Sequence, residues 1–141
     1  MAEARISFAS LVKEESAKCE RTDEEKKSVL SAFVRISGYL RMRGKKAGLE
    51  LSSENSAIAK CAYQYLHDLY GVDVRFSYTR SAGLLKRVNY HVIVDEGADE
   101  ILKDLEVDFF DPENPKEVIS SSTKVAAYLS GAFLAAGSVN N

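Results

Sequence analysis

The spacing of apolar and polar residues predicts helices that alternate with pairs of strands. Residues 22–37 begin with Thr-Asp-Glu-Glu and continue with apolar side chains at helical spacing, and Gly38 ends the pattern. Thr22 and Glu25 fit a capping box, in which each side chain accepts a hydrogen bond from the other residue's backbone amide. Apolar residues fill most of the second half, so we expect this helix to be buried on more than one side.

The rest of the chain continues this alternation. Period-two patterns on either side of a Gly-Lys-Lys turn predict a hairpin over 38–52, and a second hairpin follows over 72–94. Helical spacing predicts the remaining elements, at residues 7–19, 53–70, 97–107 and 122–137. From Thr22 the order is αββαββα followed by one more helix, which predicts an α+β fold with an antiparallel sheet.

Turn residues and composition divide the chain into four segments. Both prolines lie in an acidic stretch, as expected of a linker. We expect an N-terminal helical segment over 1–21, the αββαββα unit over 22–108, an acidic linker over 109–121 and a final helix over 122–141.

Composition adds a segregation of charge to this picture. The 141 residues are 45% apolar and carry a net charge of -2, which is typical of one globular domain. Residues 38–52 hold four bases against one acid, as do residues 72–94, whereas residues 95–117 hold ten acids against two lysines. Cys19 and Cys61 lack metal-ligand spacing, and the sequence shows no secretory signal or membrane-spanning run. We expect a cytoplasmic protein without a cofactor.

The last helix repeats the sequence of the helix predicted over 22–37. Residues 30–40 (LSAFVRISGYL) align without a gap on residues 129–139 (LSGAFLAAGSV). Small residues in both copies would let two helix backbones approach closely. The predicted helix–helix interface consists of Leu30, Ala32, Val34, Gly38, Gly131, Ala135 and Gly137. Chance similarity between two apolar helices is the alternative.

The repeat and the order of elements resemble the LAGLIDADG family, which has the homing-endonuclease fold. In that fold two such helices pack together at a pseudo-twofold axis, and each belongs to an αββαββα half. The stretches SFASLVKEE (residues 7–15) and YLSGAFLAAGSV (residues 128–139) are similar, more specifically, to the WhiA family. That family joins a LAGLIDADG-like domain to a C-terminal helix–turn–helix in bacterial regulators.

The resemblance implies a regulator of sporulation or cell division that is cytoplasmic and associated with the nucleoid. It implies that residues 122–141 are the first helix of an incomplete second repeat, so that the chain is truncated before the helix–turn–helix. DNA is the implied partner, bound weakly by this part and mainly by the helix–turn–helix.

The resemblance also implies what the helix ends should carry in a nuclease. There, an acid just before each motif glycine helps to hold the catalytic divalent metals. The equivalent positions here are Ser37 and Ala136, so we expect no catalytic residue, no metal and no enzyme activity. A metal-dependent DNA endonuclease half and a purely structural assembly module are the alternatives.

Strand alternation predicts two different sides of the sheet. The helix-facing side chains would be Leu40, Met42, Leu49, Leu51, Val72, Val74, Phe76, Tyr78, Val88, Tyr90, Val92 and Val94. The other side, called the open face below, has four arginines against two acids, and in the resembled fold it lies over DNA. The DNA-binding candidates on it are Arg41, Arg43, Arg75, Ser77, Thr79, Arg87, Asn89 and His91. An ordinary solvated or partner-binding face is the alternative.

The helix over 122–137 would lack a sheet of its own to cover. We expect Val125, Phe133 and Leu134 to be short of apolar partners, because exposed apolar patches tend to find other chains. The helix should either fold back on the helix over 22–37 or mediate self-association.

Overall fold

The computed structural model describes residues 8–83, 87–111 and 113–136. Its helices are α1 (Phe8–Lys18), α2 (Asp23–Ser37), α3 (Ser56–Tyr70), α4 (Ala98–Asp104) and α5 (Ser122–Ala136), with a short 3-10 helix η1 (Glu117–Ile119). Its strands are β1 (Tyr39–Arg43), β2 (Lys46–Ser53), β3 (Arg75–Arg80) and β4 (Val88–Val94). The predicted order of elements is confirmed. None of the helices within these ranges is long and apolar enough to cross a membrane.

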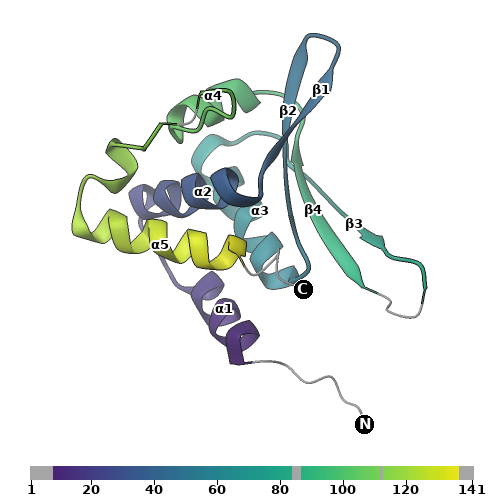
Figure 1. Cartoon of the computed structure of the whole chain (residues 1–141), viewed down its shortest axis with the longest axis horizontal. Helices are drawn as coiled ribbons and strands as arrows, with labels where there is room; N and C mark the ends of the chain where they lie inside the picture. The colour runs from purple at the N-terminus through teal and green to yellow at the C-terminus, as the bar shows by residue number, and fades with distance from the viewer. Residues whose placement is uncertain (1–7, 84–86, 112, 137–141) are drawn as a thin grey trace.

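The strands form one antiparallel sheet in the order β1-β2-β4-β3. The helices gather on one side of it, and the hairpins β1–β2 and β3–β4 project past them in opposite directions (Figure 1). This arrangement confirms the α+β class and the LAGLIDADG-like architecture. The first predicted strand of the second hairpin was too long at its start, since β3 begins at Arg75 and Val72 to Val74 make no ladder pairs.

Local signals in the sequence explain where the helices begin. The Thr22 amide donates to Glu25 Oε1 at 2.8 Å, and the Glu25 amide donates to Thr22 Oγ1 at 3.2 Å, which confirms the capping box. Asn55 caps α3 by accepting from two amides, and Gly71 ends it in the left-handed conformation at φ 60.

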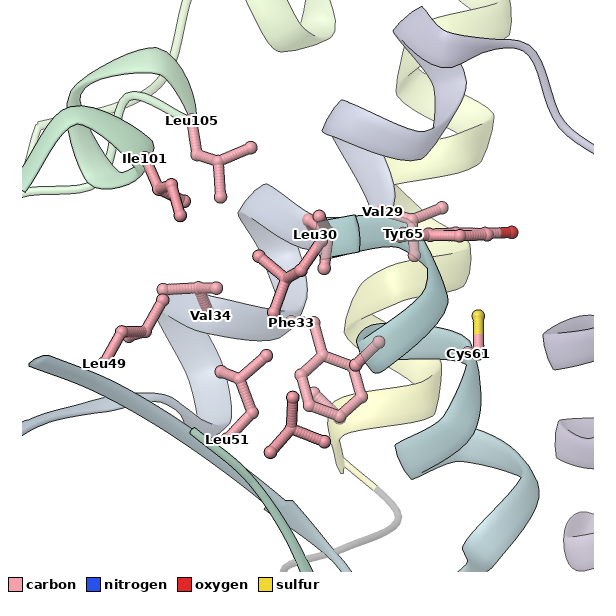
Figure 2. Packing of buried hydrophobic residues seen from close by; sticks show 14 of the residues in the cluster. Val29, Leu30, Phe33, Val34, Leu49, Leu51, Cys61, Tyr65, Ile101 and Leu105 are labelled. Carbon is pink, nitrogen blue, oxygen red and sulfur yellow. The ribbon is translucent and has the colours of Figure 1, made fainter. Parts of the chain in front are cut away.

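The main core lies between the sheet and the helices. Figure 2 shows Leu30 and Val34 of α2 among Leu49 of β2 and Ile101 and Leu105 of the α4 region. Each of these five side chains is fully buried, so α2 supplies the centre of the core. Burying side chains of this size contributes about 1.5–3 kcal/mol each.

α5 folds back on α2, and the two helices run side by side in the same direction (Figure 1). A Cβ on Gly131 would lie 2.2 Å from the Val29 carbonyl oxygen, so the two backbones are in direct contact there. Ala32 and Ala135 are fully buried. Gly38, which was also predicted at this interface, lies close to the backbone of its own helix and to β2. Gly137 lies outside the described residues.

The expectation for the outer side of α5 was partly wrong. Leu134 is fully buried because it lies on the side of α5 that contacts the rest of the chain. Val125 and Phe133 are exposed, as expected, and Leu129 is 62% exposed between them in sequence. Met42 is also exposed, although it was expected to face the helices, since the β1–β2 hairpin extends past them.

The segment between α4 and α5 is tied to α2 by specific hydrogen bonds. Glu106 has a left-handed backbone at φ 60, and its carboxylate accepts from the amides of Lys116, Glu117 and Val118 at 2.6–3.1 Å. Arg35 donates to the Glu106 carbonyl oxygen at 2.7 Å. These contacts fix the path by which the chain reaches α5.

Candidate nucleic-acid interface

The ends of α2 and α5 carry no acid at the positions that the resemblance singles out. Ser37 Oγ donates to the Phe33 carbonyl oxygen at 3.1 Å within its own helix. Ala136 offers only an exposed methyl group. Throughout the described part of the chain, no three His, Cys, Asp or Glu side chains gather in a way that could hold a metal ion.

A polar network on the open face has Glu50 at its centre. Arg41 donates to Glu50 Oε1 at 2.7 Å, and Tyr39 donates its hydroxyl proton to Oε2. His91 Nδ1 lies 2.8 Å from the same Oε2, and its Nε2 lies 3.0 Å from Thr79 Oγ1. We call these five residues the Glu50 network. It spans all four strands of the sheet, so it fixes their side chains relative to one another.

The network stabilises a carboxylate that is only 4% exposed. Burial by itself would raise the pKa of Glu50, but the hydrogen bonds from Tyr39, Arg41 and His91 outweigh it and hold the pKa below its usual value. Burial and the nearby Glu50 carboxylate raise the pKa of Tyr39 to about 12. The acid is therefore charged at neutral pH and neutralises one of the four arginines.

A second arginine of the open face is also paired with an acid. Arg75 Nε lies 2.7 Å from Asp95 Oδ2, and its terminal nitrogen lies 3.1 Å from Oδ1, so the contact is bidentate. The hydrogen bond from Arg75 lowers the pKa of Asp95, and together with the charge of Arg75 it outweighs the opposing effect of burial. Arg75 is thus occupied, although both partners are accessible to water.

Arg43 and Arg87 are the more available cations of the open face. Arg43 is exposed beside Lys46 at the tip of the β1–β2 hairpin. A pocket of about 130 Å³ lies there, lined by these two side chains, Arg41, Gly48 and the acids Asp95 and Glu96. Arg87 precedes β4 and lies 3.8 Å from Glu54, with both side chains half exposed, which is a weak surface contact.

The strand register places the predicted open-face residues on one side of the sheet. Ser77 lies opposite His91, and Thr79 lies opposite Asn89. Ser77 is exposed and Asn89 is half-buried. Sequence reasoning placed Glu50 on this side but missed that it is buried, and it missed the contact of Asp95 with Arg75. The alternation of apolar and polar residues shows which side of the sheet a residue faces. Its hydrogen-bond partner depends instead on which residues lie opposite it on the neighbouring strands.

Residues 23–108 match the family described as the WhiA N-terminal LAGLIDADG-like domain. The chain belongs to the WhiA family. Relatives named probable cell division protein WhiA include those of Lactobacillus gasseri (35% identical), Lacticaseibacillus casei (37%) and Lysinibacillus sphaericus (38%). Each match covers 96% of this chain but only 44–45% of the relative, so the chain spans less than half the length of these WhiA proteins.

Two solved WhiA structures share the fold. A crystal structure of the N-terminal LAGLIDADG domain of DUF199/WhiA has a TM-score of 0.62 at 18% identity, and it covers 94% of this chain and 59% of that one. The full-length DUF199/WhiA from Thermatoga maritima has a TM-score of 0.58 at 18% identity, with 91% and 38% covered. At this identity the likeness establishes the architecture.

Proposed function

We propose that this chain is the non-catalytic LAGLIDADG-like scaffold of a bacterial WhiA-type transcription regulator that controls sporulation or cell division. The observation that carries the proposal is the pair Ser37 and Ala136 at the ends of two helices that lie side by side. A two-metal nuclease site needs carboxylates there to offset the charge of its cations. The regulator would act in the cytoplasm, on the nucleoid.

Incubation of the protein with supercoiled plasmid and Mg²⁺ or Mn²⁺ tests the absence of catalysis. We expect the plasmid to stay supercoiled at every protein concentration. Cleavage that EDTA abolishes would overturn the proposal and favour the endonuclease alternative.

We further propose that the open face makes weak contacts to duplex DNA, chiefly through Arg43 and Arg87. Glu50 and Asp95 already neutralise Arg41 and Arg75, so few cations remain for phosphates. A helix–turn–helix in the part of WhiA that this chain does not span would supply most of the affinity.

A fluorescence anisotropy titration with a labelled duplex tests this contact. Arg43→Ala and Arg87→Ala should each weaken binding and flatten its salt dependence by about one unit of slope. Arg41→Ala should do less, because Glu50 loses its partner at the same time. Lys103→Ala, which removes an exposed base from the acidic α4, is the matched control. Equal effects of all four changes, or binding without salt dependence, would contradict the contact and favour a purely structural module.

The outer side of α5 supports a further role in self-association. Val125, Leu129 and Phe133 are exposed along one side of this helix, at spacings of four residues. Sedimentation velocity should show reversible oligomers of the wild-type chain that Leu129→Asp converts to monomers. A strictly monomeric wild-type chain would contradict this role without bearing on DNA binding.

A further inference from the structure

A row of aromatic side chains lies on the helix-facing side of the β3–β4 hairpin, next to α3. Phe76 and Tyr78 belong to β3, Tyr90 lies opposite Tyr78 on β4, and Tyr63 reaches the row from α3. The ring centroids are 6.0 Å apart for Tyr63 and Phe76, 6.0 Å for Phe76 and Tyr90, and 6.4 Å for Tyr78 and Tyr90. We call these four residues the aromatic row.

Phe76 and Tyr78 of the aromatic row are exposed, whereas Tyr63 and Tyr90 are half-buried and pack against the core. Tyr78 is 56% exposed and Phe76 is 38% exposed, whereas Val92 and Val94 on β4 are fully buried. The hairpin projects past the helices (Figure 1), and α3 reaches the row through Tyr63, which meets Phe76 edge to face. Rings that served only as core would be covered like the valines.

The charge around the aromatic row is positive. The Arg80 guanidinium lies 5.6 Å from the centre of the Tyr78 ring, a cation–π contact. No carboxylate occurs among the strand side chains on this side, which are Phe76, Tyr78, Arg80, Val88, Tyr90, Val92 and Val94. An apolar partner helix would leave Arg80 without a hydrogen-bond acceptor, whereas a nucleic acid strand offers it a phosphate and offers each ring a base.

We propose that the aromatic row is a stacking platform for the unpaired bases of single-stranded nucleic acid. Exposed aromatic residues on a four-stranded antiparallel sheet can stack two or three bases, and a nearby arginine holds the backbone. A duplex cannot use this surface, because its bases are already paired and stacked. The platform is on the opposite side of the sheet from the open face, so it is independent of the proposed duplex contact.

Anisotropy with a fluorescein-labelled 12-mer of deoxythymidylate tests the platform on the full chain. Tyr78→Ala should weaken binding by about 5- to 100-fold, because stacking on one ring is lost. Tyr78→Phe keeps the ring and should bind within twofold of wild type. Arg80→Ala should weaken binding and reduce the salt slope by about 0.7. Phe110→Ala removes an aromatic side chain that is 85% exposed elsewhere, and it should change nothing.

Intrinsic fluorescence gives a second readout, because the chain has seven tyrosines and no tryptophan. Oligonucleotide binding should quench tyrosine emission, and Tyr78→Phe should reduce the quenching while keeping the affinity. Circular dichroism checks that each variant is folded.

Three results would overturn the proposal. The wild-type chain could fail to bind the oligonucleotide, or Phe110→Ala could weaken binding as much as Tyr78→Ala. Alternatively, Tyr78→Ala could abolish self-association in sedimentation while oligonucleotide binding is unchanged, which would make the row a protein interface. Duplex binding that depends on Arg43 and Arg87 but not on Tyr78 would leave the proposed function intact in each case.

Discussion

A buried carboxylate, that of Glu50, controls how much positive charge the open face offers to a phosphate backbone. Its two oxygens accept from Arg41 and Tyr39, and His91 lies beside them. An acid this deeply buried is tolerated because each oxygen has a hydrogen-bond partner. The residue therefore stabilises the sheet and, if the proposed duplex contact exists, would reduce DNA affinity at the same time.

Glu50→Gln should separate these two effects. The change removes one negative charge and frees Arg41, so duplex affinity should rise and the salt slope should steepen by about 0.9. The free energy of unfolding, measured in urea, should fall by about 1–3 kcal/mol, because charge-assisted hydrogen bonds are lost. Glu96→Gln removes an equal charge from an exposed side chain 4.0 Å from Lys46, and it should leave stability within about 0.5 kcal/mol. Equal stability losses in the two variants would contradict this account.

The carboxylates of Glu50 and Glu106 predict how the stability of the fold depends on pH. Burial opposes the charged form of Glu50 and of Glu106, but their hydrogen bonds prevail, so both folded-state pKa values lie below the ordinary 4.5. A lowered folded-state pKa means that the stabilisation is present above pH 4.5 and is lost as the pH falls through the folded-state values. Urea midpoints should therefore be level from pH 7 to about pH 5 and then drop.

The variants Glu50→Gln and Glu106→Gln provide the controls for this pH profile. Each should flatten the acid limb, since each removes one of the titrating groups. A wild-type midpoint that stays constant down to pH 3 would contradict the assignment.

At the scale of elements, α2 and α5 depend on one residue without a side chain. Gly131 lets α5 approach so closely that an added Cβ would lie 2.2 Å from the Val29 carbonyl oxygen, which belongs to backbone and cannot rotate away. Ala32 of α2 and Ala135 of α5 are also small and fully buried.

Gly131→Ala should destabilise the protein, although a glycine-to-alanine change within a helix usually stabilises it. In an ordinary helix this change stabilises by about 1 kcal/mol through helix propensity. Here it should destabilise by about 1–3 kcal/mol, because the helices must move apart. Ala126→Gly, on the exposed side of α5, serves as a control and should cost about 1 kcal/mol. Thermal unfolding of both variants checks the sign, and a stabilised Gly131→Ala would show that α5 does not pack as described.

At the scale of the whole molecule, charge is separated between the hairpins and the α4 region. The proposed DNA contact would rest on few cations, so it should be sensitive to salt even though the net charge is only -2. With Arg43 and Arg87 as the main contacts, duplex affinity should fall about tenfold between 50 and 200 mM salt. Anisotropy measures this, while the urea midpoint should hardly change over the same range. A constant affinity would contradict the phosphate contacts.

Much of this arrangement could be predicted from the sequence, and there are physical reasons why the other features could not. Helix caps and strand alternation are local, so Thr22, Glu25 and the two sides of the sheet were predictable. The burial of Leu134 was not predicted, because the elements that bury its side chain are distant in the sequence. The roles of Glu50 and Glu106 depend on cross-strand register and on an unusual backbone angle, and neither leaves a pattern in neighbouring residues.

The carboxylate of Glu106 has a consequence for the placement of α5. It accepts hydrogen bonds from three successive amides in front of α5, so the turn that leads into this helix is held in place. The first repeat thus sets the direction of α5. In any longer chain of this design, a segment that follows α5 would pack against a helix whose orientation these contacts set.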